Sequence, residues 1–155
     1  MTLGLVPPEP LAEALVVEIV VRGQPRPKGS MRGFADSHGH VHLVPDNPRD
    51  LKAWTTAIHT AAESAMAERP IIRGAVRLQA RFILVRPRSH FGVRGNLLPS
   101  APAYPITKPD GDKLDRAARD ALKGVVYHDD AQIVRWAGDK VYGEEPGLRL
   151  RVTAL

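Results

Sequence analysis

The sequence predicts an α+β fold, with a small mixed β-sheet of about four or five strands and two main helices packed on one face. Runs of β-branched or alternating apolar residues recur at strand length, and two longer segments repeat apolar residues at helical spacing. The 155 residues are enough for one domain with its own core.

The composition indicates a globular protein with a basic surface. The formal net charge is +5 and the pI is about 9.9, which favours a polyanionic partner. The chain has no cysteine, so disulfides, thiolate metal sites and cysteine nucleophiles are excluded. No apolar run reaches the ~18–20 residues of a membrane span, and the N-terminus lacks the features of a signal peptide. We therefore expect a cytoplasmic protein with no membrane partner.

The N-terminal part predicts a leader, a strand and a basic loop. Residues 1–13 contain three prolines and are expected to form a flexible leader before a single domain at 14–155. Leu15–Arg22 is an apolar, β-branched strand. The prolines and glycines of Gly23–Arg32 exclude regular structure. This loop is either a solvated basic turn or a phosphate-binding segment with Arg26, Lys28 and Arg32.

Three histidines alternate at His38, His40 and His42. On a strand they would point to one side and could bind a transition metal. Because Ser37–Gly39 resembles a hairpin tip, a polar turn is favoured and no metal role is assigned.

A long amphipathic helix is predicted to begin at Asn47, the N-cap, followed by Pro48 at the first helical position. Its apolar residues repeat at intervals of three, four and seven until shortly before Pro70. Trp54 lies on the apolar side, so we interpret it as a core or interface residue and not a base-stacking platform.

The span from Arg69 to Lys108 contains eight cationic residues and no Asp or Glu, which favours contact with nucleic acid. Within it, Val76–Phe82 alternates as a half-buried strand. Residues 87–107 lack periodicity and form a loop long enough to need a function. Either a DNA-contacting flap or disorder without substrate fits this loop. The cations predicted to contact DNA here are Arg86, Arg88, Arg94 and Lys108.

Two acidic pairs, Asp110/Asp112 and Asp129/Asp130, flank a short predicted helix from Asp112 to Leu122. The first pair lies where helix N–H groups favour negative charge, and Gly124 stands where a left-handed residue would end the helix. Crowded carboxylates repel one another unless a cation or a proton intervenes. Oxygen ligands without cysteine or a well-placed histidine suit Mg²⁺ or Mn²⁺.

The order Asp-x-Asp-Lys-Leu, Asp-Ala-Leu-x-Gly and Asp-Asp-x-Gln-Ile between Lys108 and Ile133 resembles the RusA family of Holliday-junction resolvases. The resemblance implies that Asp110, Asp112 and Asp130 hold Mg²⁺ and are needed for cleavage. It also implies a homodimer that acts on four-way DNA junctions by paired symmetric nicks in recombination and repair. Asp129 is either a further ligand or a residue that orients its neighbour.

Arg116 occupies the position of a lysine that the family needs for activity. Arginine keeps the charge but not the titratable ammonium, so a phosphate-binding or charge-stabilising role is favoured over proton transfer. Lys113, where many members have asparagine, brings an ammonium group nearby and is a predicted DNA contact.

The remaining chain predicts a short extended stretch at Val125–Tyr127 and two final strands, Gln132–Tyr142 and Leu148–Ala154. In the last strand arginines alternate with apolar residues, so one face is wet or pressed against another chain. Two other functional classes fit this sequence less well. A nucleotide-sugar transferase would need a nucleotide-binding domain and a longer chain, whereas a non-catalytic basic DNA-binding protein would leave the paired acids without a purpose.

Overall fold

The sheet of this protein has four strands. In the computed structural model, which describes residues 15–155, they are ordered β1 (Val16–Arg22), β6 (Gly147–Ala154), β4 (Val76–Leu84) and β5 (Ile133–Tyr142). β6 runs antiparallel to both β1 and β4, while β5 pairs with β4 in parallel. The sheet is therefore mixed, as predicted. The leader predicted for residues 1–13 lies outside the described residues.

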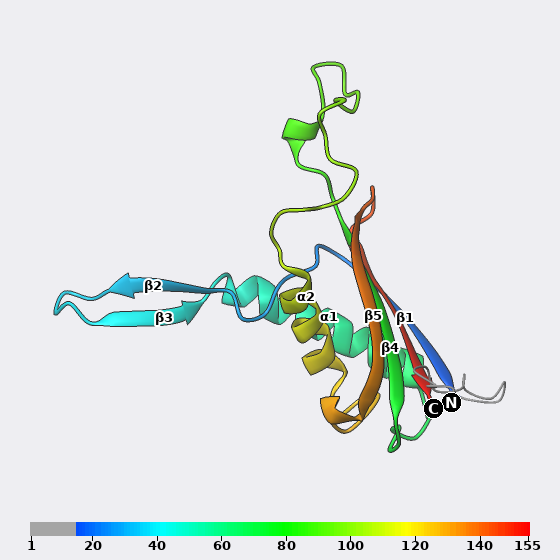
Figure 1. The fold of residues 1–155 in the computed structure, drawn as a ribbon. Helices are drawn as coiled ribbons and strands as arrows, with labels where there is room; N and C mark the ends of the chain where they lie inside the picture. The colour runs from blue at the N-terminus through cyan, green and yellow to red at the C-terminus, as the bar shows by residue number, and fades with distance from the viewer. Residues whose placement is uncertain (1–14) are drawn as a thin grey trace, which may run out of the picture.

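Two helices, α1 (Pro48–Met66) and α2 (Gly111–Leu122), lie on the same face of this sheet (Figure 1). The predicted α+β architecture is thus confirmed. Trp54 and Ile58 of α1 and Leu114 of α2 are almost completely buried between the helices and the strands. Each such large apolar side chain contributes roughly 1.5–3 kcal/mol through its removal from water. Trp54 is therefore a core residue of the chain.

Every second residue of the strands enters that core. Val17, Ile19 and Val21 of β1 are buried, and their pairing partners Val152, Leu150 and Leu148 on β6 are buried with them. Apolar strands such as these two could also have formed a dimer surface. Their apolar side chains pack inside their own chain, because both strands turn them toward the helices. The opposite face of the sheet, where Arg149 and Arg151 point, is exposed as predicted.

A β-hairpin formed by β2 (Met31–Ala35) and β3 (Val41–Pro45) projects from the domain (Figure 1). The predicted turn at its tip is present, and Asp36 organises it. The Asp36 carboxylate accepts hydrogen bonds from the backbone N–H groups of His38 and His40 and contacts the His42 ring at 2.8 Å. These contacts, His42 foremost, lower the pKa of Asp36.

One local prediction near this hairpin was wrong. Arg32 lies in β2, paired with Val44, and not in the preceding loop, because the hairpin ladder extends to Met31. Asn47 is the N-cap of α1 and Pro48 follows it, as predicted, although the φ of Asn47 is left-handed at 48° and its side chain makes no capping hydrogen bond. Left-handed backbone is tolerated by asparagine better than by most residues.

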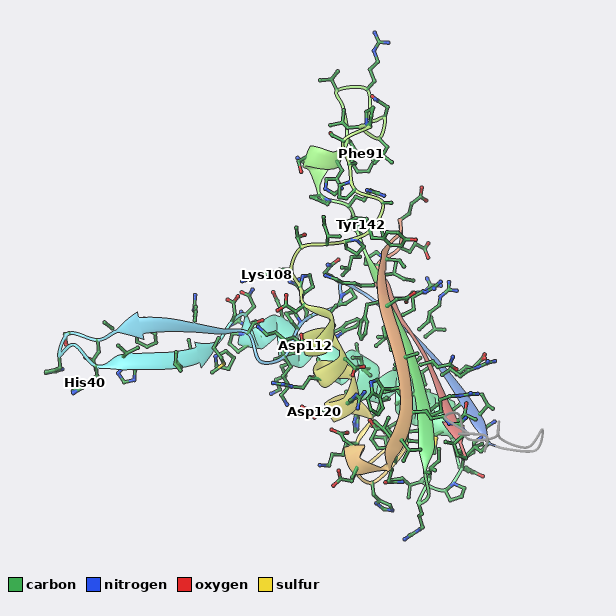
Figure 2. The ribbon with its side chains drawn as sticks, in the orientation of Figure 1. His40, Phe91, Lys108, Asp112, Asp120 and Tyr142 are labelled. Carbon is green, nitrogen blue, oxygen red and sulfur yellow. The ribbon has the colours of Figure 1, made fainter. Side chains whose placement is uncertain are left out.

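The segment between β4 and α2 extends beyond the end of the sheet (Figures 1 and 2). It is ordered by its own backbone hydrogen bonds, including Gly92 N–H to Asn96 O at 2.8 Å and Leu98 N–H to His90 O at 2.9 Å. A short 3₁₀ turn, η1, spans Arg88–His90. Apart from η1, this segment is a loop without regular structure, as expected. Its internal hydrogen bonds do not fit the alternative of a disordered loop.

Two smaller points complete the fold. Val125–Tyr127 is a tight turn and not an extended stretch, because Val125 and Val126 both donate to the carbonyl of Leu122. Among residues 15–155, no helix has the length and apolar character needed to cross a membrane.

Candidate active site

Helix α2 carries the first acidic pair. Asp110 is its N-cap residue with extended backbone, and Asp112 lies in its first turn. The helix buries Leu114, Ala117 and the apolar residues of the next turn, so its opposite side faces outward. Gly124, one residue beyond the C-cap, has a φ of +83°, the left-handed conformation that the sequence predicted for this glycine.

The first pair is exposed and carries little compensating charge. The nearest cation to Asp110 is Lys113, whose Nζ lies 3.7 Å from Oδ2. Asp112 is exposed and makes no hydrogen bond or ion pair with any other described residue. Two exposed carboxylates at a helix start, where N–H dipoles favour anions, are available to a cation.

The Pro-rich loop after β1 lies along the outer side of α2. The backbone N–H of Lys28 donates to the carbonyl of Lys113 at 2.9 Å. The same loop contacts α2 at two further positions. The Arg116 guanidinium, one turn further along the helix, lies against Gly29. The Lys28 ammonium pairs with the carboxylate of Asp120, two turns further along. Because the loop contacts α2 at three positions, it is not a freely solvated turn.

Gly29 makes room for Arg116. A Cβ atom at position 29 would lie 2.9 Å from Nη1 of Arg116, and the φ of Gly29 is +94°. A side chain here would therefore be strained and would push the guanidinium away. Glycine at this place keeps Arg116 close to the loop, on the side of α2 that carries Asp112 one turn earlier. Figure 2 shows Asp112 and Asp120 along this helix.

Asp115 lies away from this arrangement. It accepts a 2.5 Å hydrogen bond from Nε of Arg119, and both side chains are about one-quarter exposed (30% and 21%). Arg119 also lies 5.8 Å from the centre of the Trp136 ring. These residues join α2 to β5, as expected for a pair off the site-facing side of the helix.

The second acidic pair is held by Gln132. Asp129 caps the 3₁₀ turn η2 (Asp130–Gln132) and accepts from Ala131 N–H at 3.1 Å. The Gln132 side chain accepts from the N–H groups of His128 and Asp129 and donates to the carbonyls of Ile72 and Gly74. Gln132 therefore fastens the turn that carries Asp130 to the segment before β4.

We predict that Gln132→Ala lowers the free energy of unfolding by about 2–3 kcal/mol, because it leaves two N–H groups and two carbonyls without their partner. The stability would be measured by urea unfolding. The matched control is Gln79→Ala, an exposed strand residue, which should change the stability by less than about 0.5 kcal/mol. Equal stabilities of the two variants would contradict this role of the Gln132 side chain.

Asp130 is partly buried, and its Oδ1 has no hydrogen-bond partner among the described residues. Its neighbour Tyr127 is buried and donates its hydroxyl to the carbonyl of Arg119 at 3.0 Å. Burial, together with the charge of Asp130, raises the pKa of Tyr127 well above its usual range. A buried carboxylate oxygen without a partner is costly unless a cation or another donor reaches it.

The two acidic pairs lie near different parts of α2. Among residues 15–155 no three Asp, Glu, His or Cys side chains are close enough to hold one metal ion. Asp110 and Asp112 lie at the start of α2, whereas Asp130 lies beside Tyr127, whose hydroxyl reaches the second half of the helix.

The predicted DNA-binding cations differ in their surroundings. Arg88, Arg94 and Lys108 are exposed on the segment between β4 and α2. Arg86 is engaged within the chain: Nη1 donates to the Pro102 carbonyl at 2.7 Å and the guanidinium lies 4.4 Å from the centre of the Tyr142 ring. It therefore holds the base of that segment.

Two predicted DNA-binding cations lie near the N-terminal half. Arg26 is 3.7 Å from the carboxylate of Asp50 in the first turn of α1. Arg32 is exposed on the projecting hairpin. With Lys28 and Lys113 beside α2, most of the predicted cations lie on the helix-bearing side or on the two projections.

Sequence reasoning missed Lys140. From β5 its Nζ donates to the carbonyls of Thr107 at 2.7 Å and Pro109 at 2.9 Å, so it holds the chain immediately before Asp110. In the sequence it is one cation in a strand, with no motif around it. Its inward position follows only from its pairing with Phe82 of β4.

Carboxylates and cations side by side on one helix, with a glycine-containing loop against them, are typical of proteins that act on phosphate esters. The model of the endodeoxyribonuclease RusA family matches residues 18–153. The chain belongs to the RusA family of endodeoxyribonucleases. It is also 28% identical over 142 residues to the uncharacterized protein YqaN of Bacillus subtilis (strain 168), covering 88% of this chain and 94% of that protein.

Proposed function

We propose that this protein is a Mg²⁺-dependent endodeoxyribonuclease that resolves four-way DNA junctions by paired symmetric nicks, with Mn²⁺ as an alternative cation. Asp110, Asp112 and Asp130 are the proposed ligands. Membership of an endodeoxyribonuclease family supports hydrolysis of DNA. The observation that carries the assignment of the site is the exposed pair Asp110/Asp112, with a single cation 3.7 Å from Asp110 and none beside Asp112.

The donor set fits a hard divalent cation, because carboxylate oxygens are the ligands that Mg²⁺ prefers and Oδ1 of Asp130 lacks a partner among the described residues. When bound, such a cation supplies positive charge at the scissile phosphate and lowers the pKa of a nearby water. Arg116 binds a non-bridging phosphate oxygen through its fork of N–H donors. Asp129 orients Asp130 by capping its turn, and this role is favoured over that of a further ligand.

A homodimer serves this function in two ways. Two symmetric nicks need two active sites in matching orientation, which a two-fold dimer provides. A second copy can also bring its Asp130 beside Asp110 and Asp112 of the first, which one chain does not do among its described residues. We infer that each site takes its ligands from both copies. Trp136, which is 65% exposed on β5, is a candidate contact, whereas Trp54 is buried.

This arrangement predicts complementation between two inactive variants. Chains with Asp112→Asn and chains with Asp130→Asn, each inactive alone, should recover cleavage when they are co-expressed in equal amounts. Every mixed dimer has one site with both changes and one intact site, so the activity should reach about a quarter of the wild-type value. The cleavage should be single nicks, measured with a junction labelled on each strand in turn.

The control is a co-expression of Asp110→Asn with Asp112→Asn, which change the same half of the site and should stay inactive together. Light scattering of the wild type should report twice the 16.9 kDa chain mass. If the Asp112→Asn and Asp130→Asn pair is also inactive although the mixed dimers form, the ligands come from one chain. A monomeric mass together with symmetric cutting would show that paired cleavage does not need a dimer.

The proposed function is tested with a labelled four-way junction incubated with Mg²⁺, with Mn²⁺ and with EDTA. We expect symmetric cleavage with either cation and none with EDTA, while a linear duplex of the same sequence is cut far less. Cleavage that persists in EDTA would exclude the cation-dependent mechanism. Binding without cleavage under all conditions would instead support the non-catalytic DNA-binding alternative.

A further inference from the structure

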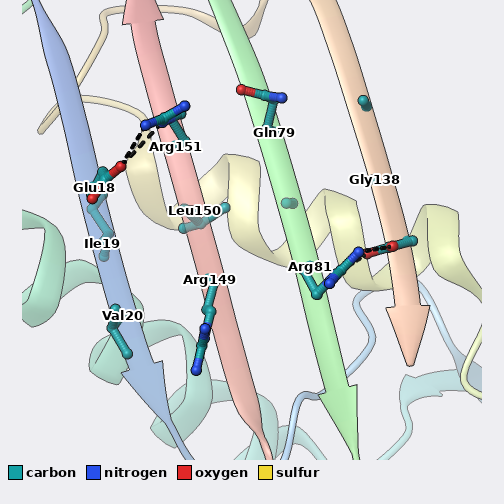
Figure 3. A pocket seen from close by; sticks show the side chains of 12 residues that line it. Glu18, Ile19, Val20, Gln79, Arg81, Gly138, Arg149, Leu150 and Arg151 are labelled. Carbon is teal, nitrogen blue, oxygen red and sulfur yellow. Dashed lines mark hydrogen bonds and ion pairs between the residues drawn. The ribbon is translucent and has the colours of Figure 1, made fainter. Parts of the chain in front are cut away.

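Among residues 15–155, no helix covers the face of the sheet that points away from α1 and α2. Figure 3 shows it across all four strands, with Val20, Arg149, Gln79 and Arg81 directed toward the viewer. The strands form a shallow hollow of about 620 Å³ on this side. Ala137 on β5 presents only a methyl group there, opposite Gln79. A sheet whose second face carries no helix usually presents a polar surface to water or to a partner.

Positively charged residues outnumber negatively charged ones on this face. Strand register places the following arginines on it: Arg22, Arg77, Arg81, Arg135, Arg149 and Arg151. The only carboxylates at the outward positions of these strands are Glu18 and Asp139. Even without Arg77 and Arg135, the four arginines at positions 22, 81, 149 and 151 outnumber the two carboxylates at these positions, which leaves an excess of positive charge. Lysine is absent from these positions, so the face is made of planar guanidinium groups.

The arginines differ in how they are engaged. Arg151 donates twice to one carboxylate oxygen of Glu18, and Arg81 forms a two-bond pair with Asp139 (Figure 3). Arg149 lies between these pairs and is exposed, and its side chain has no hydrogen bond or ion pair with a described residue. The paired arginines keep exposed side chains, 55% for Arg151 and 57% for Arg81. They can therefore still donate to another group.

The excess of positive charge selects the kind of partner. A second copy placed face to face across a two-fold axis would bring Arg149 toward its own counterpart, and like charges across an interface oppose association. A polyanion has the complementary charge. Phosphodiester groups suit arginine in particular, because its fork of N–H donors binds two phosphate oxygens at once.

We propose that this outer face of the sheet binds the sugar-phosphate backbone of a duplex DNA arm, as a second DNA surface on the side of the sheet opposite α2. Arg149 makes a direct phosphate contact, and Arg81 and Arg151 add contacts at its sides. The surface carries no sequence information, because phosphate contacts position DNA and do not read it. It holds an arm of the proposed substrate, but it takes no part in cleavage.

The test measures binding of a four-way junction and of a linear duplex by fluorescence anisotropy in EDTA, at several salt concentrations. Arg149→Gln should weaken binding about 3- to 10-fold at low salt and lower the slope of log K against log salt by about one, the value of one lost phosphate contact. Arg149→Gln with Arg151→Gln should lower the slope by about two. Glu18→Gln, which removes an anion from the same face, should strengthen binding.

Lys52→Gln is the charge-matched control, since Lys52 is exposed on α1 on the other side of the sheet, and it should change the slope less than Arg149→Gln does. Unchanged affinity and slope for Arg149→Gln, or equal effects of both substitutions, would overturn the proposal. A changed mass in light scattering for Arg149→Gln, without a change in DNA binding, would assign the face to another copy of the chain. Because no cleavage is measured, failure of the proposed nuclease activity leaves this test unaffected.

Discussion

Replacing any one of Asp110, Asp112 or Asp130 by asparagine should lower the rate of junction cleavage about 1,000-fold or more at saturating Mg²⁺. Asparagine keeps the size of the side chain but loses the charge that holds a cation. A bound cation contributes several kcal/mol to the transition state of phosphate transfer, and each 1.4 kcal/mol is a factor of ten in rate.

Junction binding by the same variants should persist or become tighter, because a carboxylate near DNA repels phosphate. Binding is measured by anisotropy and cleavage in single turnover. The matched control is Asp115→Asn, which should stay within about tenfold of the wild-type rate, since Asp115 pairs with Arg119. A near-normal cleavage rate for Asp110→Asn, Asp112→Asn or Asp130→Asn would remove that residue from the ligand set.

Arg116→Ala should lower cleavage about 100- to 1,000-fold, the usual effect of losing one donor to the charge that develops in a transition state. Arg116→Lys should retain activity within about tenfold of the wild type. Lysine places a positive charge near the same phosphate but cannot form two parallel hydrogen bonds. Single-turnover cleavage at saturating DNA separates this effect from a loss of binding.

A third variant tests how Arg116 is positioned. Gly29→Ala places a methyl group 2.9 Å from Nη1 of Arg116 and strains a backbone with a φ of +94°. It should lower cleavage in the same direction as Arg116→Ala but less strongly. If Arg116→Ala is active, the role belongs to Lys113. If alanine and lysine at position 116 are equally inactive, the geometry of the guanidinium is what matters.

The positions of the main elements were predictable from local pattern. Strand Val76–Leu84 alternates buried and exposed residues along its length, and α2 buries one apolar stripe, so each shows its period in the sequence. The hairpin tip at Ser37–Gly39 was predictable for the same reason, because turn residues act within a few positions. The same local rules placed the N-cap of α1 at Asn47, although they did not predict its left-handed backbone.

The roles of individual side chains were less predictable. Gln132 was seen as part of a motif, but its four hydrogen bonds join the acidic turn to a segment about 60 residues earlier. Lys140 showed no signal, since its two acceptors are backbone carbonyls with no side-chain pattern. Arg86 was predicted to meet DNA, but its contacts with Tyr142 and the Pro102 carbonyl were not predicted. Contacts of this kind depend on which segments the fold brings together.

The sequence by itself determined the fold class, the helix that carries Asp112, the surplus of arginine and membership of a family of DNA-cleaving enzymes. These follow from residue type and spacing, which act locally or are summed over the chain. Only the tertiary structure decided that the loop with Gly29 lies against Arg116 and that Asp130 lies beside Tyr127. It also decided that arginines of four separate strands share one face of the sheet. Strand register and helix rotation set these neighbours, and both arise from packing between segments far apart in the chain.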